Sequence, residues 1–153
     1  MPSATAPAPA AFTEEQVQTF LIRKETRIAA PLEIVFETIL EPQGPLAGMN
    51  LKIEPFPGGR WYRDLGNNAG HLWGHVQVIK PPTLLEISGP LMMSYPAISH
   101  VQYRLTKDGD GTLLVLTHRA MGLITPEHAT GVNEGWQMNV DAIQAAAEAK
   151  TKR

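Results

Sequence analysis

Residues 98–120 read ISHVQYRLTKDGDGTLLVLTHRA, and this stretch predicts a β-hairpin. Two runs with alternating apolar residues, Ile98–Thr106 and Thr112–Ala120, flank the segment Asp108-Gly109-Asp110-Gly111. Asp-Gly pairs between such runs are a strong hairpin signal, because glycine readily adopts the positive φ angles that tight turns need. The stretch therefore indicates an antiparallel sheet.

Further strands precede this hairpin. Residues 20–28 alternate charged and mostly apolar side chains, which predicts a strand with one solvated face. Four more strands, each bounded by glycine or proline, are predicted at residues 51–54, 60–65, 71–80 and 84–88. The sheet is thus expected to have many short strands with glycine and proline at the joints.

Helical periodicity appears twice. After Pro31, apolar residues at helical spacing predict a short helix that ends before Pro42. Residues 126–149 predict a long amphipathic helix whose apolar stripe consists of Val132, Trp136, Val140, Ile143 and Ala147. This order of elements predicts an α+β fold with one antiparallel sheet and a terminal helix that covers it.

The composition favours a globular domain and indicates no particular chemistry. The 13 glycines and 13 prolines of the 153 residues exceed their usual combined share of about 12%, which argues against a helical bundle. The absence of cysteine excludes a disulfide scaffold, a thiol nucleophile and a cysteine-ligated metal site. The net charge of −2 and the dispersed basic residues do not resemble a nucleic-acid or membrane footprint.

The N-terminal residues 1–11 are rich in proline and alanine, which predicts a disordered tail ahead of a single domain at residues 12–150. They lack the basic and apolar regions of a signal peptide. Thr13 and Gln16 fit a capping box between Phe12 and Val17, which predicts a helical turn. No stretch approaches the roughly 18 apolar residues of a membrane span, so a cytoplasmic location is expected.

Five local motifs occur in a characteristic order. They are Ile28-Ala29-Ala30-Pro31 leading into Val35-Phe36, Pro57-Gly58-Gly59-Arg60-Trp61, Gly74-His75-Val76 running to Lys80-Pro81-Pro82, Thr112 to Arg119, and Gly135-Trp136. Together they resemble the SRPBCC (START-like) superfamily, in its branch related to the activator of heat-shock protein 90 ATPase. The resemblance implies the helix-grip (Bet v 1-like) fold, a curved antiparallel sheet of about 6–7 strands around a long C-terminal helix. It also implies an apolar cavity between the sheet and the helix.

Two glycines, Gly131 and Gly135, interrupt the predicted final helix, where each costs up to about 1 kcal/mol relative to alanine. A close approach of the helix to the sheet, or room for a ligand, would explain this cost. A frayed first turn of the helix is the alternative.

Side chains expected to face the cavity form the candidate ligand-binding site. Aromatic side chains with a few polar groups suit a pocket wall, and Trp73 alternates with His71 and His75 along one predicted strand. The loop at residues 89–96 carries apolar side chains, and we expect a lip over the cavity, a homodimer contact or a segment folded under the sheet. The candidates are Trp61, Trp73, His75, Met92, Tyr103, Leu116, His118 and Trp136.

Histidines and one carboxylate are the candidates for acid–base chemistry. His118 shares its strand face with leucines, so it is either a core residue with satisfied hydrogen bonds or a ligand-binding group or general base. Glu86 faces solvent if its apolar neighbours face the core, and the opposite orientation would place it in the cavity with a raised pKa. His71 and His75 lie about 13 Å apart on a regular strand, too far for one zinc ion.

Three functions are compatible with these patterns. The favoured one is a domain that binds a small apolar or amphipathic molecule, such as a lipid, without a cofactor, metal, nucleic-acid partner or membrane insertion. The second is an enzyme that uses His118, His75 and Glu86, although no catalytic constellation is evident. The third is a chaperone-ATPase activator-like interaction protein, against which stands the short N-terminal tail in place of a chaperone-binding domain.

Overall fold

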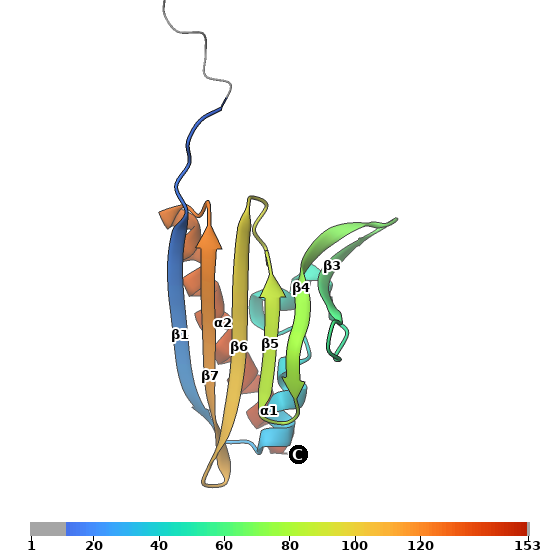
Figure 1. Cartoon of the computed structure of the whole chain (residues 1–153). Coiled ribbons are helices and arrows are strands. Elements are labelled where there is room, and N and C mark those ends of the chain that lie inside the picture. Colours follow the sequence, from blue (N-terminus) through green and yellow to red (C-terminus); the bar gives the residue numbers. More distant parts are fainter. Residues whose placement is uncertain (1–11, 153) are drawn as a thin grey trace, which may run out of the picture.

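One antiparallel sheet organises residues 12–152, the part of the chain that the computed structural model describes (Figure 1). Its strands are β1 (Gln18–Ile28), β2 (Leu51–Ile53), β3 (Arg60–Gly66), β4 (Ala69–Lys80), β5 (Leu84–Gly89), β6 (Ala97–Asp108) and β7 (Gly111–Gly122). The seven strands follow the order β1-β7-β6-β5-β4-β3-β2, so the first and last strands in the sequence are neighbours. The predicted α+β class and the strands themselves are confirmed.

The predicted hairpin is present as β6 and β7, which pair along their full length. Gly109 in its turn has a φ of +63°, a conformation that glycine adopts without steric cost. On β6, Val101, Tyr103 and Leu105 are buried whereas Arg104 is exposed. One face of the hairpin therefore belongs to the core and the other faces solvent.

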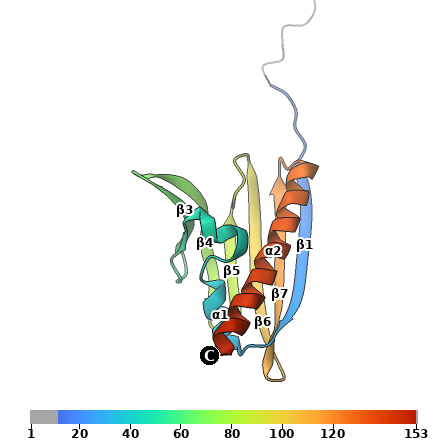
Figure 2. The ribbon, with the colours of Figure 1, turned by 180° about the vertical axis from the view of Figure 1, so that it is seen from behind.

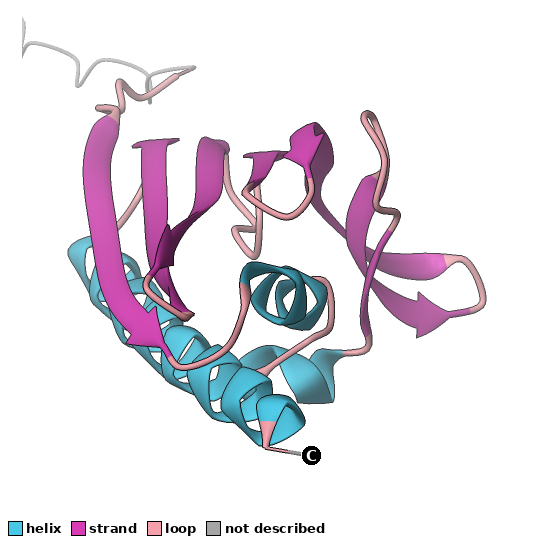
Figure 3. Cartoon of the chain, turned by 90° about the horizontal axis from the view of Figure 1, so that it is seen from below, coloured by secondary structure: helices cyan, strands magenta, loops and turns pink. Residues whose placement is uncertain are grey.

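Helices cover the concave face of the sheet. They are α1 (Leu32–Ile39), the 3-10 helix η1 (Gly44–Met49) and α2 (Pro126–Thr151). The long helix α2 crosses β1, β7 and β6, and both α1 and η1 pack against α2 on its side away from β1 (Figure 2). Seen from below, the sheet curves around these helices (Figure 3). The segment with α1 and η1 also carries the chain from β1 at one edge of the sheet to β2 at the other.

The helix α2 is held at both ends and along its length. Thr125 is the N-cap, and its hydroxyl accepts a hydrogen bond from the backbone N–H of His128 at 3.2 Å. All five residues of the predicted apolar stripe are buried against the sheet. Near the C-terminal end, Lys150 Nζ lies 3.1 Å from the carboxylate of Glu41, which follows α1. The predicted final helix is confirmed.

Replacing Thr125 with alanine is expected to lower the free energy of unfolding by about 1 kcal/mol, because the N–H of His128 loses its acceptor. The Thr125→Ser protein keeps the hydroxyl and should retain most of the stability. Urea-induced unfolding followed by circular dichroism measures both effects. An alanine variant with an unchanged unfolding midpoint would contradict the capping role.

The helical turn predicted at Thr13 is wrong. Residues 12–17 have no regular structure, and Phe12 and Val17, the expected hydrophobic staple, are 74% and 64% exposed. Because neither side chain finds an apolar partner, the capping-box pattern alone does not stabilise a helix there. The predicted tail at residues 1–11 lies outside the described residues. None of the described helices has the apolar length required to cross a bilayer.

Candidate functional site

A cavity of about 230 Å³, here called the main cavity, lies between the N-terminal half of α2, η1 and the sheet. Among the described residues, no aspartate, glutamate, lysine or arginine lines it. Its walls carry two tryptophans and two methionines, so most of its surface is carbon. The lining residues are Pro45, Leu46, Met49, Trp73, Met92, His128, Gly131, Val132, Gly135, Trp136 and Asn139.

Gly131 and Gly135 form part of the α2 wall of the main cavity. A Cβ atom placed on either glycine would meet no heavy atom within 4 Å, so neither is required by close packing. Both also lie well inside α2, which begins at Pro126, so a frayed first turn does not explain them. Of the explanations that the sequence left open, the structure supports room beside the helix.

The loop at residues 89–96 forms another wall. Leu91 and Met93 are buried in the core, while Met92 between them lines the main cavity. The hydroxyl of Tyr95 is hydrogen-bonded to Nδ1 of His128 on α2, and the two rings meet edge-on. This loop therefore both folds onto the protein and forms a lip of the cavity, as two of the three expectations stated.

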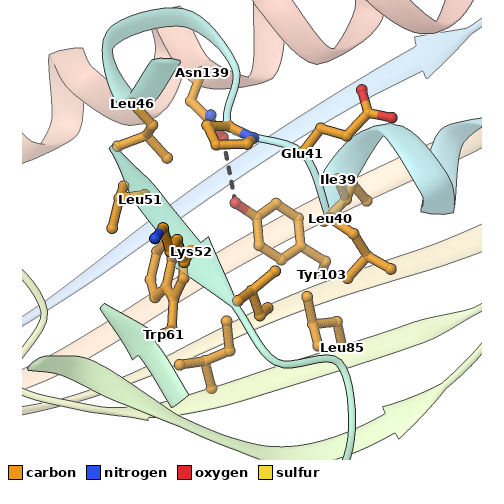
Figure 4. Close-up of a pocket in the computed structure, with 13 residues that line it drawn as sticks. Ile39, Leu40, Glu41, Leu46, Leu51, Lys52, Trp61, Leu85, Tyr103 and Asn139 are labelled. Atoms are coloured by element: carbon orange, nitrogen blue, oxygen red, sulfur yellow. Dashed lines mark hydrogen bonds between the residues drawn. The ribbon is translucent and has the colours of Figure 1, made fainter. Parts of the chain in front are cut away.

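A smaller pocket of about 30 Å³ lies next to the main cavity, and Leu46 and Asn139 line both spaces (Figure 4). This volume has room for about one water molecule. In it the hydroxyl of Tyr103 points toward Asn139 and donates to Oδ1 at 3.3 Å, while Asn139 Nδ2 donates to the carbonyl of Gln43 at 3.2 Å. Burial raises the pKa of Tyr103 well above its ordinary value. Tyr103 is therefore a neutral hydrogen-bond donor that fixes Asn139.

His118 is a core residue with satisfied hydrogen bonds. Its ring is fully buried, Nδ1 accepts a hydrogen bond from the indole N–H of Trp136 at 2.8 Å, and Nε2 lies 2.9 Å from the hydroxyl of Ser99. Because Nδ1 is an acceptor, the proton of the neutral ring is on Nε2, which donates to Ser99. Burial lowers the pKa of His118 to about 4, so the ring is neutral near pH 7.

His75 does not line the cavity, and that prediction is wrong. Trp61 pairs with Gly74 but the next residue, Tyr62, pairs with Leu72, so Trp73 is an extra residue that bulges from β4. A bulge changes the face to which the following residues point. Trp73 remains buried, whereas His75 is exposed on the convex side of the sheet.

Glu86 also lies on the convex face, the orientation expected when its apolar neighbours face the core. Its carboxylate accepts a hydrogen bond from Gln102 at 2.8 Å and lies 3.2 Å from Nε2 of His100. Partial burial by itself raises the pKa of Glu86, but the hydrogen bonds from Gln102 and His100 outweigh it and the pKa is lowered. The Glu86 carboxylate is therefore ionised at neutral pH. It is not the cavity acid with a raised pKa that the opposite orientation would have produced.

The structure thus divides the candidate ligand-binding residues into four groups. Trp73, Met92 and Trp136 line the main cavity, Trp61 and Tyr103 line the small pocket, Leu116 and His118 are packed in the core, and His75 is outside. His118, His75 and Glu86 do not come together, so the expected acid–base group is not assembled. Within residues 12–152, no three histidine, aspartate or glutamate side chains gather closely enough to hold a metal ion.

Comparison with known proteins assigns the family. The sequence profile described as "Activator of Hsp90 ATPase homolog 1-like protein" matches residues 29–148, which is most of the chain. The chain belongs to this family. A comparison with curated sequences finds no match.

Solved structures share the fold of this family member. An uncharacterised protein from Rhizobium leguminosarum superposes with a TM-score of 0.69 at 17% identity, with 90% of this chain and 99% of that chain covered. CalU16 from Micromonospora echinospora gives a TM-score of 0.59 at 25% identity, with 91% and 90% covered. The Mll3558 protein from Rhizobium loti gives 0.67 at 21% identity, with 86% and 99% covered. These likenesses establish the helix-grip fold.

Several lining residues escaped the sequence analysis. His128 and Asn139 lie on the same helix face as the two glycines, since positions 128, 131, 132, 135, 136 and 139 follow helical spacing. This helical spacing was the sequence signal that could have identified His128 and Asn139 as lining residues. Met49 and its neighbours in η1 had none, because only the crossing of the chain over the sheet brings η1 against α2.

Proposed function

We propose that this protein binds a small, largely apolar molecule in the main cavity. The observation that carries the proposal is the pair Gly131 and Gly135, which leave open space beside the N-terminal half of α2. Alanine at both positions would favour the helix by up to about 2 kcal/mol in total, and nothing in the packing opposes its methyl groups. A helix that forgoes this stability beside a cavity is well suited to hold a ligand.

The volume limits the size of that molecule. An apolar cavity of about 150 Å³ is enough for benzene, so a main cavity of about 230 Å³ suits a molecule with one or two rings. Met49 and Met92 on opposite sides can adapt their side chains to ligands of different outline. The carbon-rich walls favour burial of an apolar ring system.

Binding is proposed rather than acid–base catalysis by His118, His75 and Glu86 because of where these three side chains lie. Both ring nitrogens of His118 are already hydrogen-bonded, one to Trp136 and the other to Ser99. His75 and Glu86 are on the convex side of the sheet, away from the cavity. The main cavity can therefore bind an apolar ligand, but none of these three side chains is placed to react with it.

A substitution on α2 that fills the main cavity tests the proposal. In the Gly135→Leu protein the new side chain occupies the main cavity, so the affinity for 2-acetylnaphthalene, a neutral two-ring probe, should fall at least about tenfold. The free energy of unfolding should stay equal or rise, because leucine is a better helix former than glycine. Fluorescence titration measures the affinity, and urea unfolding measures the stability.

Asn133→Leu is the matched control, since Asn133 is exposed on another face of the same helix. This variant should bind 2-acetylnaphthalene as the parent protein does. Failure of the parent protein to bind the probe, or equal affinity in the parent and Gly135→Leu proteins, would refute the proposed site.

A further inference from the structure

Two buried side-chain donors in residues 12–152 lack any hydrogen-bond acceptor, and they come from the neighbouring strands β3 and β4, one of them in the wall of the main cavity. They are Nε of Arg63 and the indole Nε1 of Trp73. A buried donor without an acceptor lowers stability, more so when it is charged, and native proteins have few of them. Two such donors in one place indicate that an acceptor is missing from that place.

Arg63 and Trp73 are on the concave side of neighbouring strands. Arg63 stands opposite the buried Leu51 of β2 and two residues after the buried Trp61, so it points to the concave face. On the other side of the sheet, Lys52 and Asp64 pair at 3.0 Å. The acidic neighbour of Arg63 in the sequence is therefore bound elsewhere and on the opposite face.

His71 completes the group. It is directly opposite Arg63 across β3 and β4, and it precedes Trp73 by two residues, which places the three side chains on one face. Arg63 and His71 are partly buried, and neither takes part in any ion pair among the described residues. A guanidinium and an imidazole directly opposite each other, with no carboxylate beside them, form a group of N–H donors between which an anion can bind.

We propose that the ligand of the main cavity is an amphipathic carboxylate whose anionic group binds between Arg63 and His71. This inference rests on the proposed function and adds the chemical class of the ligand. Trp73 lines the cavity, and His71 lies about 7 Å further along the strand, a distance that a carboxylate on a one- or two-ring body can span. The guanidinium of Arg63 matches the two oxygens of a carboxylate, and His71 and Trp73 supply further N–H donors.

An amphipathic carboxylate would match both the apolar part of the site and the part that carries Arg63 and His71. The rings of the ligand would lie against Trp73 and Trp136, where no charged side chain is present among the described lining residues. The carboxylate would lie beside Arg63 and His71, which have no carboxylate partner among residues 12–152. A neutral ketone of the same shape would fill the cavity but offer these donors only one uncharged acceptor oxygen, without the charge and the second oxygen of a carboxylate.

Two probes of the same shape test the inference. 2-Naphthoate and 2-acetylnaphthalene share the ring system and the number of heavy atoms, and only the first is an anion. The parent protein should bind 2-naphthoate at least about tenfold more tightly in a fluorescence titration. The Arg63→Met protein should lose that preference, with an affinity for 2-acetylnaphthalene that changes less than about twofold.

Unchanged binding of the neutral probe also shows that the Arg63→Met protein keeps its fold and cavity. Lys52→Met is the matched control, because it removes one positive charge from the convex face and should leave the preference intact. His71→Leu is a second variant and should weaken 2-naphthoate binding alone.

The outcomes separate the two proposals. Equal affinity of the two probes for the parent protein would overturn the carboxylate site and leave the apolar cavity supported. An Arg63→Met protein that still prefers 2-naphthoate would overturn the role of Arg63. If neither probe binds the parent protein, both the cavity function and the carboxylate site are wrong.

Discussion

The Trp136→Ala protein is expected to have a free energy of unfolding about 3–5 kcal/mol below that of the parent protein. The Trp136 ring is only 4% exposed and meets the rings of Tyr103 and His118 edge-on. Its N–H also donates to Nδ1 of His118 at 2.8 Å. Alanine removes the ring, leaves a space, and deprives a buried acceptor of its donor. Urea unfolding measures the loss.

Two further variants separate the causes of this effect. Trp136→Phe keeps a ring and loses the N–H, so a loss of about 1–3 kcal/mol is expected from the unpartnered His118 nitrogen. Met138→Ala changes a side chain of α2 that is 59% exposed, and its effect should stay within about 0.5 kcal/mol. A Trp136→Ala protein as stable as the Met138→Ala protein would contradict the packing described here.

The same substitution should change ligand binding, because Trp136 lines the main cavity. Alanine enlarges the cavity by the volume of an indole ring, and free indole is expected to occupy that space. Since a ligand that binds only the folded state stabilises it, indole should raise the unfolding midpoint of Trp136→Ala more than that of the parent protein.

Acidification from pH 7.5 to pH 5 is expected to lower the free energy of unfolding by about 2 kcal/mol through His118 alone. Burial lowers the pKa of His118 to about 4 in the folded protein, whereas the ring in the unfolded chain has a pKa of about 6.5. Between these values the unfolded state binds the additional proton. Stability is therefore fully retained above the higher pKa and is lost as the pH falls toward the lower one.

The His118→Gln protein isolates this contribution. The glutamine amide can accept from Trp136 and donate to Ser99, and it does not titrate. The variant should be less stable than the parent at pH 7.5, since the edge-on contact with Phe20 is lost, but its stability should vary less between pH 7.5 and pH 5. Urea unfolding at both pH values gives the two slopes.

Other titrating groups are separated from this effect by pH or by a control variant. Glu54, whose pKa the hydrogen bonds from Arg60 lower to about 2, loses its charge only at lower pH. His100→Gln removes a histidine from the convex face, 3.2 Å from Glu86, and serves as the control for the loss of a histidine elsewhere in the chain. Equal slopes in the parent and His118→Gln proteins would show that His118 does not carry the acid sensitivity.

Local patterns in the sequence predicted most of the fold. The Asp-Gly turn at Gly109 and the alternation around it located the long hairpin, because a tight turn and a half-buried strand depend on near neighbours. The stripe on α2 was correct at all five positions for the same reason. The turn expected at Thr13 failed because a helix start also needs apolar packing, and Phe12 has no partner.

The site depended on contacts that the sequence does not display. The bulge at Trp73 turned His75 away from the cavity, although regular alternation placed both on one face. His118 had two open interpretations until Trp136, on a different element, proved to donate to its ring. Asn139 was not among the predicted site residues, yet hydrogen bonds with Tyr103 and Gln43 hold it in the wall of both the main cavity and the smaller pocket.

Thus the sequence alone determined the elements, their order and the unusual glycines of α2. Only the tertiary structure decided that Gly131 and Gly135 face open space, and that Arg63, His71 and Trp73 come together on one face of the neighbouring strands β3 and β4. The physical reason is the range of the interactions. Periodicity and turn conformation arise within a few residues, whereas a cavity and its unpaired donors arise where segments distant in the chain pack together.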